Sequence, residues 1–145
     1  MANRHVAERY ATALASWDLT SLKDLVHPDI VVRYPQSGET FEGIDNYLAT
    51  IEEYPGLPGM GEVSSGSSAR ESVIVTQSFP FTAPIVTVIG DGETFVGEFV
   101  AAYPNGDTYH VASIVRIRDG LVIEDTAYFG PPFDPPEWRR KYQAG

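Results

Sequence analysis

The feature of the sequence that most constrains the fold is a predicted β-hairpin, in which the strands Thr108–Arg118 and Leu121–Phe129 are joined by Asp119-Gly120. An Asp-Gly pair between β-branched runs strongly predicts a hairpin, because glycine accepts the positive φ that the turn requires. Successive side chains of a strand point to opposite faces, and one face of this hairpin is largely apolar. The apolar face is expected to hold Tyr109, Val111, Ser113, Val115, Ile117, Ile123, Ala127 and Phe129. The other face is expected to hold His110, Arg116, Arg118, Glu124 and Thr126.

Asp125 is the exception to this alternation, because its spacing places a carboxylate on the apolar face, between Ile123 and Ala127. An ionised, unpaired carboxylate would be costly there. We therefore expect Asp125 to be paired, to be neutral, or to face a wet cavity. A desolvated carboxylate has its pKa raised toward neutrality and can exchange a proton with a substrate. The alternative is a structural carboxylate that accepts a hydrogen bond from a tyrosine hydroxyl in a polar core.

Composition and charge exclude several classes of function. A length of 145 residues and a hydrophobic content of 43% predict a single domain over residues 1–145. The formal charge of −10 argues against binding to nucleic acid or to an anionic membrane surface. The chain has no cysteine, so it cannot form a disulfide, a thiolate nucleophile or an iron–sulfur site. The N-terminal segment does not resemble a signal peptide, and no apolar run approaches the ~20 residues of a membrane span, so we expect a cytoplasmic protein.

Three segments of the N-terminal half show the spacing of helices. The first helix is predicted from one shared face: Val6, Tyr10, Ala13, Leu14 and Trp17. The second is short, with an N-cap at Asp18, Thr20 or Ser21 and an end at His27-Pro28. The third is predicted from Ile44, Tyr47, Leu48 and Ile51, and it is followed by Pro55-Gly56.

The remaining segments predict strands, one long loop and a tail. Strands are expected at Ile30–Tyr34, Val73–Gln77, Ile85–Ile89 and Thr94–Tyr103. Residues 55–68, rich in glycine and serine, are expected to form a mobile loop, either functional or simply disordered. The proline-rich residues 130–145 are expected to lie extended over the body, anchored by Phe133 and Trp138.

The turn before the hairpin decides which side chains share a face. Pro104-Asn105-Gly106 predicts a three-residue turn. That turn would place one set of side chains on the same face as Tyr109 and Ser113, namely Phe95, Gly97, Phe99, Ala101 and Tyr103. A two-residue turn would send them to the other face.

Three helices followed by a run of strands predict an α+β fold. We expect the three N-terminal helices to pack in the concave face of a strongly curved, mixed or antiparallel sheet, which forms a cone-shaped α+β barrel around a cavity.

The order of elements and several short motifs resemble the nuclear transport factor 2-like (NTF2-like) superfamily, and within it the SnoaL-like branch. The resemblance covers almost the whole chain. The segments that carry it are Glu8–Leu14, Asp18-Leu19, His27–Pro35 with Gly43, and Val115–Gly120. They identify the fold well and the reaction poorly, because one fold hosts isomerases, cyclases, dehydratases, epoxide hydrolases and non-catalytic binders.

The resemblance also implies roles for individual residues. Tyr10 matches the helix-1 tyrosine that donates to the developing oxyanion in ketosteroid isomerase. Tyr34 stands where that enzyme has its general base, and Ser113 where it has a protonated aspartate. Ala127 aligns with the acid/base aspartate of SnoaL-like cyclases, and Asp125 lies one inward step earlier. Ordinary steroid isomerisation is therefore not expected, and the match to a cyclase or to the Asp-Arg-Asp set of limonene epoxide hydrolase is incomplete.

From these observations we predict a catalytic set of Asp125, Tyr10 and Tyr34. The expected ligand-binding residues are Trp17, Phe95, Phe99, Tyr103, Tyr109, Ser113 and Phe129. His110 is expected on the polar face, and it would become a candidate base if the strand register were different. For each tyrosine, a place in the aromatic core is the alternative to a place in the pocket. The three histidines are not at metal-ligand spacing and no phosphate-binding loop is present, so neither a metal nor a cofactor is expected.

The sequence thus predicts a small enzyme that isomerises, cyclises or dehydrates a hydrophobic, oxygenated molecule, such as a polyketide or terpenoid, by proton transfer. A non-catalytic binding protein and an epoxide hydrolase-like enzyme are the alternatives. A homodimer is expected through the open side of the sheet, where Val100, Ala112 and Ile114 would lie.

Overall fold

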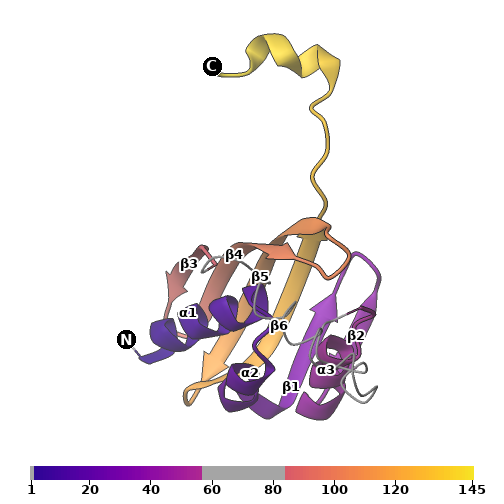
Figure 1. Cartoon of the computed structure of the whole chain (residues 1–145). Helices are drawn as coiled ribbons and strands as arrows, with labels where there is room; N and C mark the ends of the chain where they lie inside the picture. Colours follow the sequence, from indigo (N-terminus) through magenta and orange to yellow (C-terminus); the bar gives the residue numbers. More distant parts are fainter. Residues whose placement is uncertain (1, 57–83) are drawn as a thin grey trace.

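A computed structural model describes residues 2–56 and 84–145. Three helices come first, and together with six strands they build a two-layer α+β body from which a C-terminal segment projects (Figure 1). The predicted strand at Val73–Gln77 and nearly all of the predicted loop at 55–68 lie outside the described residues. In the part of the chain that the structure describes, no helix is long and apolar enough to cross a membrane.

The three helices form where the sequence predicts them, except that the first ends at Ala15 and leaves Trp17 outside it, with a φ of 58°. Helix α1 spans Ala2–Ala15 and α3 spans Ile44–Glu52. Helix α2 spans Leu19–Leu25, and Asp18 caps it by accepting a hydrogen bond from the Ser21 backbone N–H at 3.1 Å. Such a cap satisfies one of the donors that a helix leaves unpaired at its first turn.

The six strands form one sheet in the order β2-β1-β6-β5-β4-β3. Their bounds are β1 Val26–Tyr34, β2 Glu39–Glu42, β3 Val86–Asp91, β4 Thr94–Ala102, β5 Thr108–Arg118 and β6 Leu121–Gly130. Strand β1 pairs with β6 in parallel, and all other pairs are antiparallel. The sheet is therefore mixed, and within the described residues it stays open, with β2 and β3 as its edges, instead of closing into the expected barrel.

The register between β4 and β5 follows the predicted three-residue turn. Ala101 pairs with Tyr109 and Gly97 pairs with Ser113. Next to the turn, the Tyr103 backbone N–H donates to the Asp107 carbonyl at 2.8 Å. Residues opposite each other in an antiparallel pair share a face, so the inner face carries the residues that the turn predicted.

A β-bulge in β6 sets the register of the central hairpin. Arg118 pairs with Leu121 across Asp119-Gly120, but Val115 pairs with Asp125, which leaves one extra residue in β6 between these pairs. The burial pattern shifts with it, since Val122 is fully buried and Ile123 is not. The expectation that Ile123 belongs to the inner face is therefore wrong, while Asp125 does lie there.

Two boundaries near the first strand differ from expectation. Strand β1 begins at Val26, so His27-Pro28 lies inside it, at an irregularity in the pairing with β6. Proline lacks an N–H and is tolerated in a sheet at such irregularities. The short edge strand β2, which pairs with β1 across a turn at residues 35–38, was not predicted. It has four residues and mostly exposed side chains, so it carries little periodic signal.

All three helices cover one face of the sheet (Figure 1). Helix α1 packs on β3, β4, β5 and β6, and α3 packs on β1 and β2. Small residues allow a close approach: a Cβ added to Gly97 of β4 would lie 3.2 Å from the Cβ of Ala11 in α1. This contact holds Tyr10, the neighbour of Ala11, deep in the core.

The C-terminal residues 131–145 do not lie over the body, and this expectation is corrected. They extend away beyond the end of β6 and finish in a short 3-10 helix, η2, at Glu137–Tyr142 (Figure 1). The expected anchors Phe133 and Trp138 are 78% and 69% exposed. Four prolines keep the segment extended and deprive it of N–H donors that could join a sheet.

Candidate active site

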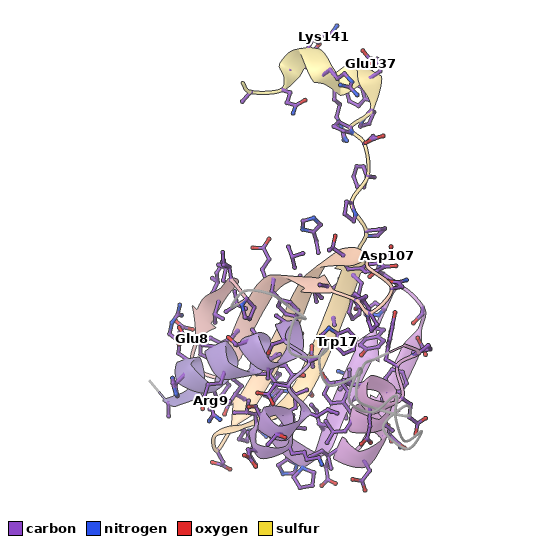
Figure 2. All side chains as sticks on the ribbon, viewed as in Figure 1. Glu8, Arg9, Trp17, Asp107, Glu137 and Lys141 are labelled. Carbon is purple, nitrogen blue, oxygen red and sulfur yellow. The ribbon has the colours of Figure 1, made fainter. Side chains whose placement is uncertain are left out.

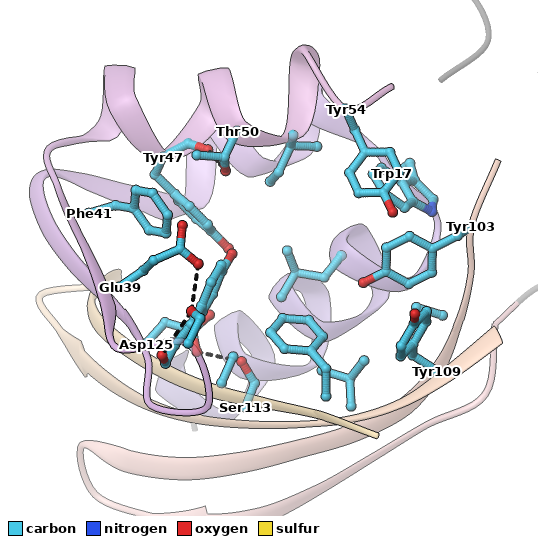
Figure 3. Close-up of a pocket in the computed structure, with 18 of the residues that line it drawn as sticks. Trp17, Glu39, Phe41, Tyr47, Thr50, Tyr54, Tyr103, Tyr109, Ser113 and Asp125 are labelled. Atoms are coloured by element: carbon cyan, nitrogen blue, oxygen red, sulfur yellow. Dashed lines mark hydrogen bonds between the residues drawn. The ribbon is translucent and has the colours of Figure 1, made fainter. Parts of the chain in front are cut away.

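A cavity of about 550 Å³ lies between the helices and the inner face of the sheet (Figure 3). Ligand pockets for small molecules typically have volumes of ~300–1,000 Å³ and mostly apolar walls. The apolar walls here consist of Leu14, Leu22, Phe41, Ile51, Phe99, Ala101, Val111, Ala127 and Phe129. Polar groups are confined to particular parts of the wall, so the cavity has distinct ends.

The first end of the cavity, the carboxylate end, is built around Asp125. This side chain is 1% exposed. Its Oδ1 accepts a hydrogen bond from Ser113 Oγ at 2.5 Å, and its Oδ2 accepts one from the Tyr10 hydroxyl at 2.5 Å. Ser113 lies on the neighbouring strand β5 and pairs with Ala127, so it is diagonally opposite Asp125. Asp125 is therefore both paired and on the cavity wall, which combines two of the expected alternatives.

The hydrogen bonds at this end have a defined direction. The hydroxyls of Tyr10 and Tyr47 lie 2.7 Å apart. A phenol has one hydrogen, and that of Tyr10 is donated to Asp125. Tyr47 must therefore donate to Tyr10, so the chain runs from Tyr47 through Tyr10 to Asp125. Only the two ends of this chain, Tyr47 and Asp125, line the cavity, and Tyr10 lies behind them.

Burial controls the protonation of this group of side chains. Desolvation raises the pKa of Asp125 to about 6, while the hydrogen bonds from Ser113 and Tyr10 oppose that rise by stabilising the ionised form. Desolvation and the charge of Asp125 raise the pKa values of Tyr10 and Tyr47 well above that of an ordinary tyrosine. Both tyrosines thus remain neutral donors across the physiological range, and Asp125 is the group that titrates.

The second end of the cavity, the aromatic end, holds Trp17, Tyr54, Tyr103 and Tyr109 (Figure 3). The ring of Tyr103 lies 5.2 Å from Trp17, 5.3 Å from Tyr54 and 4.9 Å from Tyr109, in tilted or edge-to-face arrangements. Trp17 is fixed further by its Nε1, which donates to the Ala102 carbonyl at 2.8 Å. This end presents aromatic rings together with the Tyr103 hydroxyl, which points into the cavity (Figure 3), and it suits an aromatic part of a ligand.

Tyr34 lies on the wall beside the carboxylate end. Its ring packs edge-to-face on Phe41 and Phe129, with ring centroids 5.2 and 5.1 Å away. Gln36 fixes this corner, because its side-chain amide exchanges two hydrogen bonds with the backbone of Phe129. Burial and the charge of Asp125 raise the pKa of Tyr34, so its hydroxyl stays protonated.

The structure brings most of the sequence-predicted site residues to one cavity. Its wall includes Asp125, Tyr34, Trp17, Phe99, Tyr103, Tyr109, Ser113 and Phe129. Tyr10 contacts Asp125 from behind the wall, and Phe95 is buried in the core away from the cavity. His110 is exposed and pairs with Val100 and Gly130, so the register in which it would face the cavity does not occur.

The main residue that the sequence did not assign to the site is Tyr47. It occupies an inward position of α3 and looked like an ordinary core residue. A hydroxyl on the buried face of a helix needs a hydrogen-bond partner, and that requirement was the available signal. Glu39, Thr50 and Tyr54 also line the cavity and were not predicted. Glu39 lies in β2, Thr50 near the end of α3 and Tyr54 just after that helix, and none of these positions carries a pattern that points to a site.

Within residues 2–56 and 84–145, no three Asp, Glu or His side chains come together in a group that could hold a metal ion. The polar side chains that line the cavity are hydroxyls, the buried carboxylate of Asp125, and the exposed Gln36 and Glu39.

Comparisons with known proteins place this fold among solved structures. No protein-family model matches the sequence. No functionally curated protein matches it either. The chain is similar to an NTF2-like protein of unknown function from Burkholderia xenovorans, at 26% identity and a TM-score of 0.71, covering 99% of this chain and 94% of that one.

Two further solved structures are similar at lower identity. One is a protein from Kribbella flavida provisionally assigned as a ketosteroid isomerase, at 19% identity and a TM-score of 0.69, covering 99% of this chain and 89% of that one. The other is IdmH from Streptomyces antibioticus, provisionally assigned as a polyketide cyclase, at 17% identity and a TM-score of 0.50, covering 88% and 91%. Such likeness shows the fold and not the reaction. The architecture, with its helices on one face of a mixed sheet, is an NTF2-like fold, as the resemblance of the sequence to that superfamily predicted.

Proposed function

We propose that the protein is an enzyme that moves a proton on a hydrophobic, oxygenated small molecule, such as a polyketide- or terpenoid-like compound, without a cofactor. The observation that carries this proposal is the directed chain of hydrogen bonds that meets the cavity at Tyr47 and at Asp125. Isomerisation is the reaction that this arrangement favours most. Dehydration and cyclisation use the same groups.

Asp125 is the general base in this proposal. With a pKa of about 6 it is mostly ionised at neutral pH, and it is a stronger base than an exposed carboxylate. Ser113 and Tyr10 donate their hydroxyl hydrogens to it, and Tyr47 donates its own to Tyr10, so the carboxylate end presents oxygen lone pairs to the cavity. A ligand group that brings an acidic C–H or O–H fits that end. Positioned acid–base groups contribute typically ~10²–10⁴-fold to a rate.

Tyr47 supplies the return of the proton. Once Asp125 is protonated it can donate to the Tyr10 oxygen, and the chain then reverses, so that Tyr10 donates to Tyr47 and Tyr47 donates into the cavity. One proton leaves the ligand at Asp125, and one is returned to a different ligand atom from Tyr47. The enzyme ends as it began, and the ligand is isomerised.

The rest of the cavity supports this chemistry. The aromatic end and the apolar walls offer a binding surface for a hydrophobic skeleton, which would orient its oxygenated part toward Asp125. The names of two fold relatives, which are provisionally assigned as a ketosteroid isomerase and a polyketide cyclase, support this class of reaction. In this proposal the carboxylate acts from β6, whereas the resemblance aligns Tyr34 of β1 with the position of the isomerase base.

The test uses a panel of polyketide- and terpenoid-like ketones and enols in deuterium oxide, with NMR detection of deuterium incorporation and of isomerised product. The parent should label and isomerise at least one compound, and Asp125→Asn should lower that rate by about 10²–10⁴-fold. Glu124→Gln removes a carboxylate from the same strand on the outer face, where it pairs with Arg116, and should leave the rate unchanged.

Three outcomes would redirect the proposal. An Asp125→Asn variant as active as the parent removes the proposed base. A ligand that binds, as seen in Trp17 fluorescence, but returns without deuterium or rearrangement identifies a binding protein. Solvent ¹⁸O in the product of an epoxide identifies a hydrolase that activates water.

A further inference from the structure

The C-terminal arm, residues 131–145, exposes large aromatic side chains that a monomer leaves unused. Phe133 is 78% exposed, Trp138 69% and Tyr142 74%. Figure 2 shows the labelled arm residues Glu137 and Lys141 far from the side chains of the body. Several large aromatic groups on one projecting segment are typical of a surface that binds another molecule.

The arm also differs from the rest of the chain in charge. It contains three basic and two acidic side chains, so of the total formal charge of −10 the remaining residues carry −11. Two of its cations lie over its own rings, Arg139 over Trp138 at 5.8 Å and Lys141 over Tyr142 at 5.2 Å. The end of the arm is therefore a compact unit of aromatic rings and positive charge, which suits an apolar surface that carries an acidic group.

The outer face of the sheet offers such a surface. We call outer patch the set of adjacent residues on β4, β5 and β6 that point away from the helices. Its members are Val96, Glu98, Val100, Ala112, Ile114 and Tyr128. Val100, Ile114 and Tyr128 are large apolar side chains that remain exposed. Glu98 lies among them, opposite Ala112, and within the described residues it forms no ion pair.

The arm does not reach the outer patch of its own chain. It continues beyond the end of β6 and away from the sheet (Figure 1). Pro131, Pro132, Pro135 and Pro136 stiffen it, because proline restricts φ and favours extended chain. Its extended part, residues 131–136, spans roughly 19 Å at about 3.1 Å per residue, whereas the two strand spacings from β4 to β6 add up to only about 10 Å at about 4.8 Å each. It is therefore long enough to cross the outer patch of a neighbouring molecule.

We propose that the arm of one copy docks on the outer patch of a second copy, and that the exchange is reciprocal and closes a twofold homodimer. Trp138 and Tyr142 pack against Val100, Ile114 and Tyr128, and the basic side chains of the arm lie near Glu98. Self-complementary exchange of this kind satisfies both surfaces at once and leaves no open end. The homodimer expected from the sequence is thereby held by the arm, a segment to which the sequence assigned a different place.

The first experiment measures the oligomeric state of the full chain by sedimentation equilibrium. The parent should be a dimer at micromolar concentration, and Trp138→Ala/Tyr142→Ala should weaken the dimer by about a hundredfold or more, as expected for aromatic anchors. Gln143→Ala, in the same arm, should match the parent. A monomeric parent, or a double variant that dimerises like the parent, overturns the proposal.

A second pair of variants tests the proposed attraction between the basic side chains of the arm and Glu98. Glu98→Lys places a cation in the outer patch and should weaken the dimer by about tenfold or more through repulsion of the arm. Glu42→Lys makes the same change on the exposed edge strand β2 and should have little effect. Circular dichroism confirms that both variants fold. Equal dimerisation by the two variants removes the outer patch as the docking site.

The third experiment separates exchange between chains from folding back. Because the chain has no cysteine, a chain with Gln143→Cys can be mixed with a chain with Ala112→Cys and treated with a short bismaleimide. A cross-linked pair containing one chain of each kind is expected. If instead a single chain with both substitutions cross-links within itself at high dilution, and the mixed chains do not cross-link, the arm folds back on its own body and the proposal fails.

Discussion

The two ends of the cavity use the same residue type in different ways. At the carboxylate end, the hydroxyls of Tyr10 and Tyr47 belong to one directed chain that ends on Asp125. At the aromatic end, Tyr54, Tyr103 and Tyr109 interact with Trp17 and with one another through their rings. Tyrosine hydroxyls therefore form a hydrogen-bonded chain at one end, and tyrosine rings form a packed cluster at the other. This difference predicts that substitutions at the first end change rates, whereas those at the second change affinity.

The largest effect should be a dependence of stability on pH that Asp125 alone introduces. Its pKa is about 6 in the folded protein, whereas that of an ordinary aspartate is 3.8. Between these values the folded state binds more protons, so the free energy of unfolding falls as pH rises from about 4 to 6, by roughly 3 kcal/mol in total. The Asp125→Asn variant does not lose stability in this way, because asparagine does not titrate. Urea denaturation of both proteins from pH 4 to 7 should therefore show the variant gaining stability relative to the parent as pH rises. A difference in the free energy of unfolding that stays the same at every pH would contradict this prediction.

The second effect concerns the rate. If Asp125 acts as the base, only its ionised form is active, so the rate should rise with pH to a plateau above about pH 6. Below that value it should fall about tenfold for each pH unit, or roughly a hundredfold at pH 4. A pH–rate profile of the labelling reaction checks this. A rate that instead decreases as pH rises through 6 would show that the protonated acid is the active form.

The third effect separates removal of the proton from its return. Tyr47→Phe removes the hydroxyl at the cavity end of the chain and leaves the contacts of Asp125 with Ser113 and Tyr10 in place. Isomerisation should fall by about ten- to a hundredfold, while deuterium exchange at the site of abstraction falls less. Following both signals in one NMR experiment gives their ratio. Equal losses would mean that Tyr47 does not return the proton.

The smallest effect should come from the aromatic end. Tyr103→Leu removes the ring that contacts Trp17, Tyr54 and Tyr109. Aromatic pairs contribute about 0.5–1.5 kcal/mol beyond their buried area, so ligand affinity should fall by roughly fivefold with little change in kcat. Titration of Trp17 fluorescence measures the affinity. A large loss of kcat with unchanged affinity would contradict the prediction that the aromatic end affects affinity and the carboxylate end affects the rate.

Local patterns in the sequence account for much of the fold. The helical spacing of Ile44, Tyr47, Leu48 and Ile51 coincides with α3, and the turn at residues 104–106 has the predicted register. These features depend on neighbours along the chain, so they can be read without the tertiary structure. Strand β2 could not be predicted from local patterns, because it forms a strand mainly through its pairing with β1.

The sequence predicted most of the residues that line the candidate site, but not the hydrogen bonds between them. Aromatic and hydroxyl residues on the inner face of β4, β5 and β6 followed from strand alternation. The contact between Tyr10 and Tyr47 joins two helices that are far apart in the sequence. Their meeting depends on how closely α1 and α3 approach the sheet, which Gly97 and Ala11 decide for α1 through packing.

The hairpin of β5 and β6 shows where the information in the sequence ends. Asp119-Gly120 and the flanking β-branched residues determined that two strands would meet there. The tight turn alone would place Asp125 opposite Ile114, on the outer face, whereas the bulge in β6 pairs it with Val115 and turns it into the cavity. A bulge forms where packing of the whole sheet favours it, and here it lets Val122 and Asp125 both face inward. The sequence by itself determined, through the spacing of Asp125 from Ala127, that a carboxylate would lie on the apolar face of this hairpin. Only the tertiary structure decided the bulge that reconciles this face with the tight turn, and which hydroxyls hold the carboxylate.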